Sequence, residues 1–212
     1  MIETESNQSK AFGLARDQGK RATCLAFAAS DLNAVAHRLP HHLSVEYLCH
    51  HAALKVRGWS PDDGFGVDVV LAAVRAPGQP PEAQYPYRPD EPLAPLTTPP
   101  TVPGPRYTGM GAEPSWTSAE VFNRVRAGQP VGIVVSVSRS MMKPVSATVA
   151  FDPFRLPNVY HALIGVGTGF DRRSGEPHLL VRNSWGSAWG LDGHAWMPER
   201  HLAVHFHGCF TV

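Results

Sequence analysis

Residues 17–28 read Asp-Gln-Gly-Lys-Arg-Ala-Thr-Cys-Leu-Ala-Phe-Ala, and they place a cysteine, Cys24, at the first turn of an apolar helix. Thr23 stands at the N-cap position, and an alanine-rich run of helical spacing continues to Leu39 before a proline ends it. The amino end of a helix carries partial positive charge and unpaired N–H groups, and both stabilise a thiolate. The stretch therefore predicts a helix over 23–39 with a reactive thiol at its start, although a lone cysteine in such a helix can also be a small buried side chain.

Gln18 lies six residues before this cysteine, on the loop that leads into the helix. Its side-chain amide can point to the same place as the backbone N–H of Cys24, which would give two hydrogen-bond donors for a developing oxyanion. Gln18 is therefore a candidate catalytic residue.

Two further segments supply the groups that a nucleophilic cysteine needs. His161 begins an apolar strand predicted over 161–168, and Asn183 follows a second strand predicted over 178–181. A turn at 171–175 joins these strands, so the two side chains should lie side by side. The histidine can then act as a base toward the thiol, while the asparagine orients the imidazole through its other ring nitrogen.

The chain divides into a helical first half and a strand-rich second half, joined by a proline-rich crossing. Two more helices are predicted in the first half, at 44–53 and 67–76. Residues 77–114 hold 12 of the 20 prolines, and we expect an extended surface strap with four apolar anchors, Tyr85, Tyr87, Leu93 and Leu96. The second half predicts a helix at 117–127 and additional strands at 131–137, 195–197 and 204–212. The polar residues 1–10 are expected to be frayed.

The composition is that of a globular protein, because 43% of the 212 residues are hydrophobic and 17% are charged. A formal net charge of +1 argues against nucleic acid or an anionic membrane as a partner, and no apolar run is long enough to cross a bilayer. Three cysteines are too few for a disulfide scaffold, and the first residues lack the features of a signal peptide. We expect a cytoplasmic protein, or one exported without a cleaved signal peptide.

Eleven histidines raise the question of a metal site. His205, His207 and Cys209 alternate along the last predicted strand, and Zn²⁺ accepts such ligands. The histidine pairs at 41–42 and 50–51, however, point in different directions on a helix and lack the usual ligand spacing. We predict no metal site and no cofactor.

Together these segments resemble the papain family of cysteine peptidases (family C1), and the matches follow the family's order along most of the chain. The most specific match is the string Asn-Ser-Trp-Gly-x-x-Trp-Gly at 183–190, which resembles the segment of the family's catalytic asparagine. His161 lies 137 residues after Cys24, which is the separation typical of the family. The other matching segments are Gln18-Gly19, Ala26-Phe27, Leu43-Ser44 with Glu46, Gly64-Phe65 with Leu71, Tyr85-Pro86-Tyr87, Gln129-Pro130-Val131 and His161-Ala162. The Gly64-Phe65 form and the missing disulfide cysteine are closest to bacterial members.

The resemblance implies an α+β, papain-like two-lobe fold. A helical lobe would pack against a β-barrel-like lobe, with the active site in the cleft between them. The whole chain, residues 1–212, would form a single peptidase domain, with the helical lobe at about 11–105 and the β lobe at about 106–212.

The resemblance also implies a role for each candidate residue. A Cys24 thiolate paired with a His161 imidazolium would attack the peptide bond, Asn183 would orient the imidazole, and Gln18 would hold the oxyanion. Four residues match positions that bind substrate, namely Gly64, Phe65, Tyr160 and Trp185. No cofactor is implied, and the implied partners are a peptide or protein substrate and a cognate protein inhibitor.

The sequence departs from the family's pattern just before the candidate nucleophile. Arg21-Ala22-Thr23 stands where the family usually has Cys-Gly-Ser, so Arg21 replaces a disulfide cysteine and that bridge cannot form. Leu25 replaces the usual tryptophan. About 16 residues precede Asp17, fewer than the family's inhibitory pro-segment needs, which favours a mature or truncated form or another means of control.

Two other functions fit the same residues. The acyl-enzyme can pass its acyl group to an amine, which would make the protein a transpeptidase, deamidase or isopeptidase, including a toxin or effector. The unusual Arg-Ala-Thr-Cys-Leu segment could also belong to a catalytically inactive peptide-binding module. The joint presence of Cys24, His161, Asn183 and Gln18 argues against an inactive module, because simple binding requires none of them.

Overall fold

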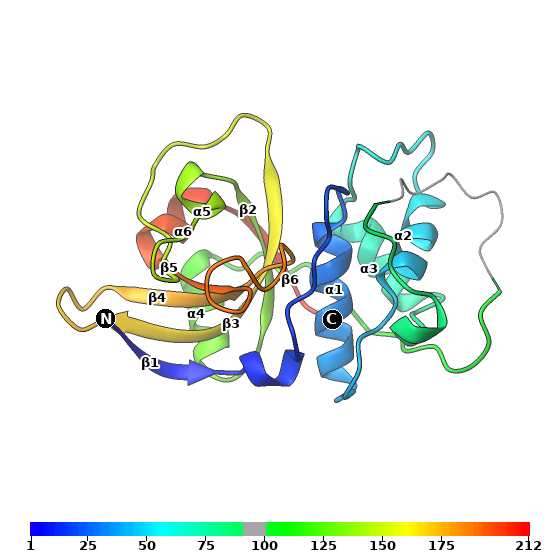
Figure 1. The fold of residues 1–212 in the computed structure, drawn as a ribbon, viewed down its shortest axis with the longest axis horizontal. Coiled ribbons are helices and arrows are strands. Elements are labelled where there is room, and N and C mark those ends of the chain that lie inside the picture. Colours follow the sequence, from blue (N-terminus) through cyan, green and yellow to red (C-terminus); the bar gives the residue numbers. More distant parts are fainter. Residues whose placement is uncertain (91–100) are drawn as a thin grey trace.

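Three helices pack together in one lobe, and a six-stranded sheet with its own helices forms the other (Figure 1). The computed structural model describes residues 1–90 and 101–212. The helices of the first lobe are α1 (Cys24–Ala36), α2 (Val45–Ala53) and α3 (Val67–Arg75). The sheet contains β1 (Ile2–Asn7), β2 (Val131–Ser136), β3 (Tyr160–Asp171), β4 (Pro177–Arg182), β5 (His194–Pro198) and β6 (Phe206–Phe210). The other elements are α4 (Ser118–Arg126), α5 (Arg139–Met142), α6 (Glu199–His205) and two 3-10 turns, η1 (Ser9–Phe12) and η2 (Glu82–Gln84).

Capping side chains set the start of two predicted helices. The hydroxyl of Ser44 accepts a hydrogen bond from the Tyr47 backbone N–H at 3.0 Å, and α2 begins at the next residue, Val45. Thr117 and Glu120 form a reciprocal capping box at the start of α4. Because a capping side chain satisfies N–H groups that the helix itself leaves unpaired, these two helices begin where the sequence predicts.

The sheet is antiparallel throughout, in the order β5-β4-β3-β2-β6, and β1 pairs with β3 beside this path. The α+β, two-lobe class is thereby confirmed. Among the described residues the sheet is open, so the strand lobe is not the closed barrel that the word barrel-like suggests. Helix α6 occupies the chain between the two end strands, β5 and β6.

Strand β3 divides its side chains between two hydrophobic cores. Ala162, Ile164 and Val166 point toward the helical lobe and pack in the core that α1, α2 and α3 form. Leu163 points to the other face and joins the core between the sheet, α4 and α6. Because successive side chains of a strand point to opposite faces, β3 belongs to both cores and joins the two lobes. Its first residues lie beside α1.

The expectation that residues 1–10 are frayed is wrong, because Ile2–Asn7 form β1 on the outer part of β3. Glycines on β3 permit this pairing, since a Cβ at Gly167 would lie 2.4 Å from the carbonyl oxygen of Ser6. The Ser6 hydroxyl also lies 3.0 Å from the hydroxyl of Thr168. Polar residues thus form a strand here, because one face of β1 is exposed to solvent and its backbone N–H and C=O groups pair with those of β3.

Two other expectations need correction or lie outside the structure. The strand predicted over 204–212 is shorter, because residues 204 and 205 belong to α6 and β6 ends at Phe210. Two predicted anchors of the proline-rich strap, Tyr85 and Tyr87, are partly buried, whereas Leu93 and Leu96 lie outside the described residues.

The sheet lobe buries two stacked histidines of α6. The rings of His201 and His205 lie 4.3 Å apart at 22°, and both residues are fully buried. His201 Nδ1 accepts a hydrogen bond from the Asp152 backbone N–H, and its Nε2 lies 3.3 Å from the Ser138 hydroxyl. Burial, together with the charge of His205, lowers the pKa of His201 to about 4.

We therefore expect the free energy of unfolding to fall as the pH drops from about 6.5, the pKa of an unfolded histidine, toward 4. In this window the unfolded chain binds a proton that the folded chain excludes. A His201→Gln variant should lose part of that slope in urea unfolding measured between pH 7 and 4.5. His41 is exposed, so a His41→Gln variant is the matched control and should keep the wild-type slope. Equal slopes for His201→Gln and wild type would contradict this explanation.

Candidate active site

Cys24 is the first residue of α1 and lies half-buried at the start of the helix. The Thr23 side chain does not cap the helix and instead forms a 2.8 Å hydrogen bond with the Tyr87 hydroxyl. Burial raises the pKa of the Cys24 thiol, and hydrogen bonding from the backbone of Ala162 and Leu25 acts in the opposite direction. The contact with Ala162 brings the sulfur next to the start of β3, where His161 lies.

His161 and Asn183 meet as the hairpin of β3 and β4 predicts. His161 Nε2 lies 2.6 Å from Asn183 Oδ1, and both residues are buried. The Ser184 backbone N–H also donates to this oxygen at 2.8 Å, which identifies it as the acceptor atom of the amide. His161 Nε2 must therefore carry a proton, so Nδ1 of the neutral ring is left as a base.

Aromatic side chains cover this pair on one side. The ring of Trp185 lies 4.3 Å from that of His161, and Trp189 meets Trp185 edge-on at 6.1 Å. The Trp189 indole N–H donates to the carbonyl oxygen of Met141 at 2.9 Å, which fixes the indole in place. Burial lowers the pKa of His161 to about 4, and its hydrogen bond with Asn183 acts in the opposite direction.

Gln18 is buried and linked to the Asn183 segment through its neighbour Ser184. The Gln18 backbone N–H donates to the Ser184 carbonyl at 2.9 Å, and the Ser184 hydroxyl donates to Gln18 Oε1 at 2.7 Å. Gln18 Nε2 donates one hydrogen to the carbonyl oxygen of Arg21 at 2.8 Å. An amide carries two such hydrogens, so one remains for a ligand.

Tyr87 holds both ends of the loop between Gln18 and Thr23. Its hydroxyl donates to the Gln18 carbonyl at 2.9 Å and accepts from the Thr23 hydroxyl at 2.8 Å. Burial raises the pKa of Tyr87 to about 12, so the phenol keeps the proton that it donates. The sequence indicated Tyr87 as an apolar anchor and as part of the matching Tyr-Pro-Tyr segment, and neither observation pointed to its two hydrogen bonds.

An ion pair holds the same loop against α2. Arg21 Nη1 lies 2.6 Å from Glu46 Oε2 of α2, and the guanidinium also lies over the Tyr87 ring at 4.6 Å. All three cysteines of the chain are free thiols. The loop before Cys24 is thus fixed to α2 by charge.

The residues expected to bind substrate lie near the site from two directions. Gly64 accepts a 2.7 Å hydrogen bond from the Trp59 indole, and Phe65 stacks on Trp59 at 5.1 Å. A Cβ at Gly64 would lie 3.4 Å from the Ala22 carbonyl oxygen, which puts this segment against the loop before Cys24. Tyr160, directly before His161, is 56% exposed and contacts His207 edge-on.

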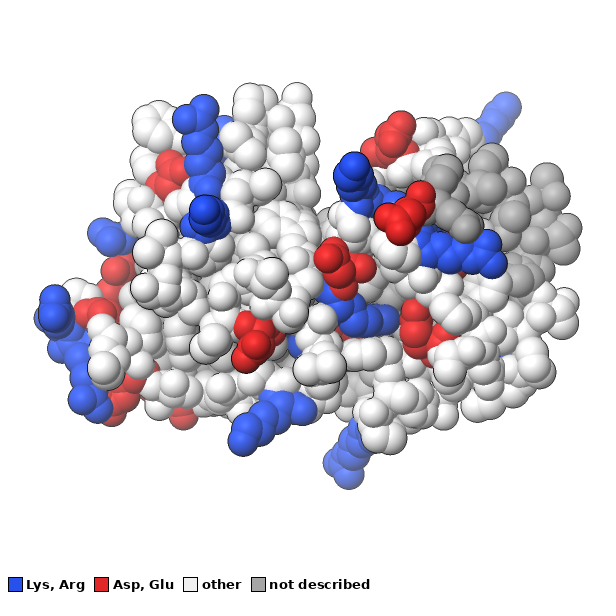
Figure 2. All heavy atoms as spheres, viewed as in Figure 1, with Lys and Arg blue, Asp and Glu red and all other residues white. Residues whose placement is uncertain are grey.

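The surface is notched between the two lobes at the top of the view in Figure 2, at the end of the molecule where α1 and β3 begin (Figure 1). Basic and acidic side chains are mixed on this face. Among residues 1–90 and 101–212 no three His, Cys, Asp or Glu side chains are grouped so that they could hold a metal ion. None of the described helices is long and apolar enough to span a membrane.

A family model and several curated proteins match this chain. The family model described as papain family cysteine protease matches residues 3–205. A segment of 44 residues is 52% identical to cathepsin C of Schistosoma mansoni, but it covers 21% of this chain and 9% of that relative. The chain therefore spans only a small part of the curated relatives it matches.

Many solved structures resemble the chain over nearly its whole length, and two of them illustrate the likeness. A cysteine protease of Carica candamarcensis in complex with E-64 has a TM-score of 0.71 at 21% identity, over 96% of this chain and 94% of that one. Xylellain, a cysteine protease from Xylella fastidiosa, has a TM-score of 0.71 at 20% identity, over 100% of this chain and 92% of that one. At such low identity these likenesses concern the fold.

The two hydrogen bonds of Tyr87 should keep the loop at 18–23 closed. A Tyr87→Phe substitution removes both, so we expect the free energy of unfolding to fall by about 1–2 kcal/mol and amide hydrogen exchange to accelerate in residues 18–24. Tyr85→Phe is the matched control, because the Tyr85 hydroxyl contacts His50 rather than this loop. Equal exchange of the loop in the two variants, followed by mass spectrometry, would refute the tether.

Proposed function

The chain belongs to the papain family of cysteine proteases, and we propose that it hydrolyses peptide bonds in peptide or protein substrates with Cys24 as the nucleophile. The observation that carries this proposal is the His161–Asn183 hydrogen bond of 2.6 Å. That bond leaves Nδ1 of His161 as the base, on the strand whose next residue contacts the Cys24 sulfur.

In the first half of the reaction, the Cys24 thiol gives its proton to His161 Nδ1 and the sulfur attacks the substrate carbonyl carbon. The carbonyl oxygen takes up negative charge, and the backbone N–H of Cys24 and the remaining amide hydrogen of Gln18 donate to it. The C–N bond then breaks as His161 returns the proton to the leaving amine. A thioester on Cys24 remains.

In the second half, His161 takes a proton from a water molecule that attacks the thioester carbonyl. The C–S bond breaks, the proton returns to the sulfur, and the carboxylic acid product leaves. Asn183 acts throughout by holding the imidazole in the orientation and tautomer that these transfers require.

Burial sets the electrostatic conditions for the first proton transfer. It raises the pKa of Cys24 and lowers that of His161, so it disfavours an isolated thiolate and an isolated imidazolium alike. Moving one proton from sulfur to nitrogen forms both charges together. Their mutual attraction, strong in surroundings of low dielectric, and the positive end of α1 then offset the cost of burial.

We also propose that the protein works in a reducing compartment. Its three thiols are free, and the Arg21–Glu46 ion pair fixes the loop where the family has a disulfide cysteine. A peptide-like inhibitor or a cognate protein inhibitor would bind where the substrate binds. E-64, bound to the similar Carica protease, is the probe that we would use for Cys24.

Replacing the nucleophile should abolish turnover without unfolding the chain. We expect Cys24→Ala to lower the hydrolysis of denatured casein by at least about 10⁴-fold and to prevent covalent labelling by E-64, with the circular dichroism spectrum unchanged. Cys209→Ala is the control, because Cys209 is buried in the core of the sheet lobe. Residual turnover in a pure Cys24→Ala preparation would show that another group performs the chemistry.

The imidazole should make the thiol reactive at a pH where a lone buried thiol is inert. Iodoacetamide is therefore expected to alkylate wild-type Cys24 rapidly near pH 6, well below the unperturbed cysteine pKa of about 8.5. In His161→Ala the reaction should move to alkaline pH, because burial then raises the thiol pKa without a partner charge. Peptide mapping identifies the labelled residue. Identical pH profiles for the two proteins would rule out a Cys24–His161 pair.

A further inference from the structure

One buried carboxylate connects the three segments that carry Gln18, Cys24 and Asn183. Asp31 lies on α1, seven residues and about two turns after Cys24. Its Oδ2 lies 2.9 Å from Nε of Arg182, the residue directly before Asn183. Its Oδ1 lies 2.5 Å from Nη2 of Arg16, two residues before Gln18.

All three charged side chains are inside the protein. The exposed fractions are 7% for Asp31, 1% for Arg182 and 12% for Arg16. Burial alone would raise the pKa of Asp31, but the attraction of the two guanidinium groups outweighs it and lowers the pKa. The carboxylate therefore stays ionised, and His42, whose Nδ1 lies 3.7 Å from Oδ1, faces it as well.

Arg182 has a partner for each of its guanidinium nitrogens. Besides the bond from Nε to Asp31, Nη1 donates to the carbonyl oxygen of Gly13 at 3.0 Å, and Nη2 donates to those of Phe12 and Leu14. The side chain thus fixes the backbone that leads to Gln18. A lysine has no planar fork and cannot make these contacts together.

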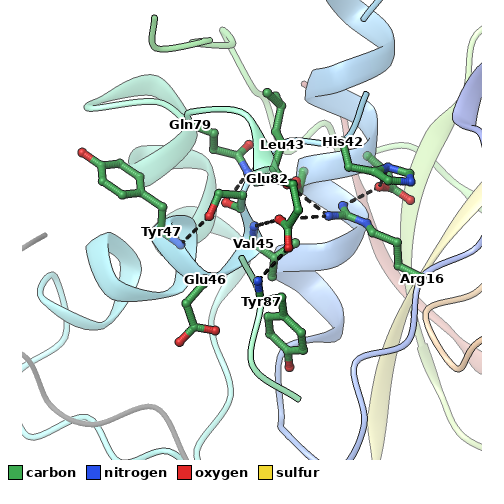
Figure 3. A network of polar contacts seen from close by, with 12 residues as sticks. Arg16, His42, Leu43, Val45, Glu46, Tyr47, Gln79, Glu82 and Tyr87 are labelled. Carbon is green, nitrogen blue, oxygen red and sulfur yellow. Dashed lines mark hydrogen bonds and ion pairs between the residues drawn. The ribbon is translucent and has the colours of Figure 1, made fainter. Parts of the chain in front are cut away.

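Arg16 continues the network into the helical lobe, as Figure 3 shows. Its Nη1 donates to the Leu43 carbonyl at 3.0 Å and lies 3.7 Å from Glu82 Oε2. Glu82 in turn accepts hydrogen bonds from the backbone N–H groups of Val45 and Tyr87. The same Tyr87 holds the Gln18–Thr23 loop, so the network reaches the candidate oxyanion residues from a second side.

Helix α1 packs against β3 beside this ion pair, in the core that holds Phe27, Ala28 and Ala162. A shift of the helix along β3 would therefore disturb this packing and move the groups on the strands. The separation of Cys24 from His161 depends on how α1 sits against β3 and β4.

We propose that Asp31 and Arg182 are positioning residues, whose ion pair sets the distance between Cys24 and the His161–Asn183 pair. The inference rests on the proposed function, since it concerns the same site. Neither residue needs to contact the substrate.

The test compares Arg182→Met, Arg182→Lys and Asp31→Asn with wild type in labelling by E-64. We expect Arg182→Met and Asp31→Asn to lower the maximal labelling rate of Cys24 at least tenfold, while the half-saturating concentration of E-64 changes less than threefold. Arg182→Lys keeps the charge and should fall between them and wild type. The double variant Asp31→Asn/Arg182→Met should lose less than the product of the two single losses, because both substitutions break the Asp31–Arg182 contact.

Leu202→Ala is the matched control for lost stability, because Leu202 is fully buried in the sheet-lobe core, away from the network. It should be destabilised yet label at the wild-type rate. If Arg182→Met fails to fold, Arg182→Lys decides. A folded variant that labels like wild type, or a control that is equally slow, overturns the positioning role. Wild-type protein that neither labels at Cys24 nor hydrolyses casein would instead refute the proposed function, and this inference with it.

Discussion

Strand β3 is buried on both faces, and the arrangement of the two lobes depends on that constraint. Its side chains alternate between the helical core, which receives Ala162, and the sheet core, which receives Leu163. Its first residues lie where the lobes separate, so the packing of β3 brings His161 to the amino end of α1. The relative position of the thiol and the imidazole is therefore a property of the fold, and the local hydrogen bonds refine it.

The site keeps fixed charges around it and favours neutral groups at its centre. Arg16, Arg21 and Arg182 are each held by a buried carboxylate within 2.5–2.9 Å. Such pairs are costly to break, because removing one partner leaves a charge in surroundings that cannot solvate it. The Cys24 sulfur and the His161 ring have no fixed counter-ion among the described contacts. In the proposed mechanism, a change in the charge of either group therefore depends on its position relative to the other.

Local signals predict most of the elements and the central residues of the site. Ser44 and Thr117 cap helices through bonds within one turn, and the hairpin of β3 and β4 brings His161 to Asn183 over a short stretch of chain. Contacts between distant segments carry no such signal. The Asp31–Arg182 pair joins residues 151 positions apart, and the two bonds of Tyr87 depend on the path of the proline-rich strap. β1 was missed because its residues are polar and its partner strand supplies the order.

The pairing of β1 with β3 also has a consequence for association between molecules. An unpaired strand edge is a template on which a second chain can add a strand. β1 covers the edge of β3 from Gly167 to Asp171, where glycines would leave a flat and accessible backbone. β1 becomes the outer edge in its place, and its exposed Glu3 and Glu5 and its irregular register at Thr4–Ser6 make it a poor template for a further strand. A protein that lost the first seven residues by proteolysis would keep its candidate site but expose an edge more prone to aggregation.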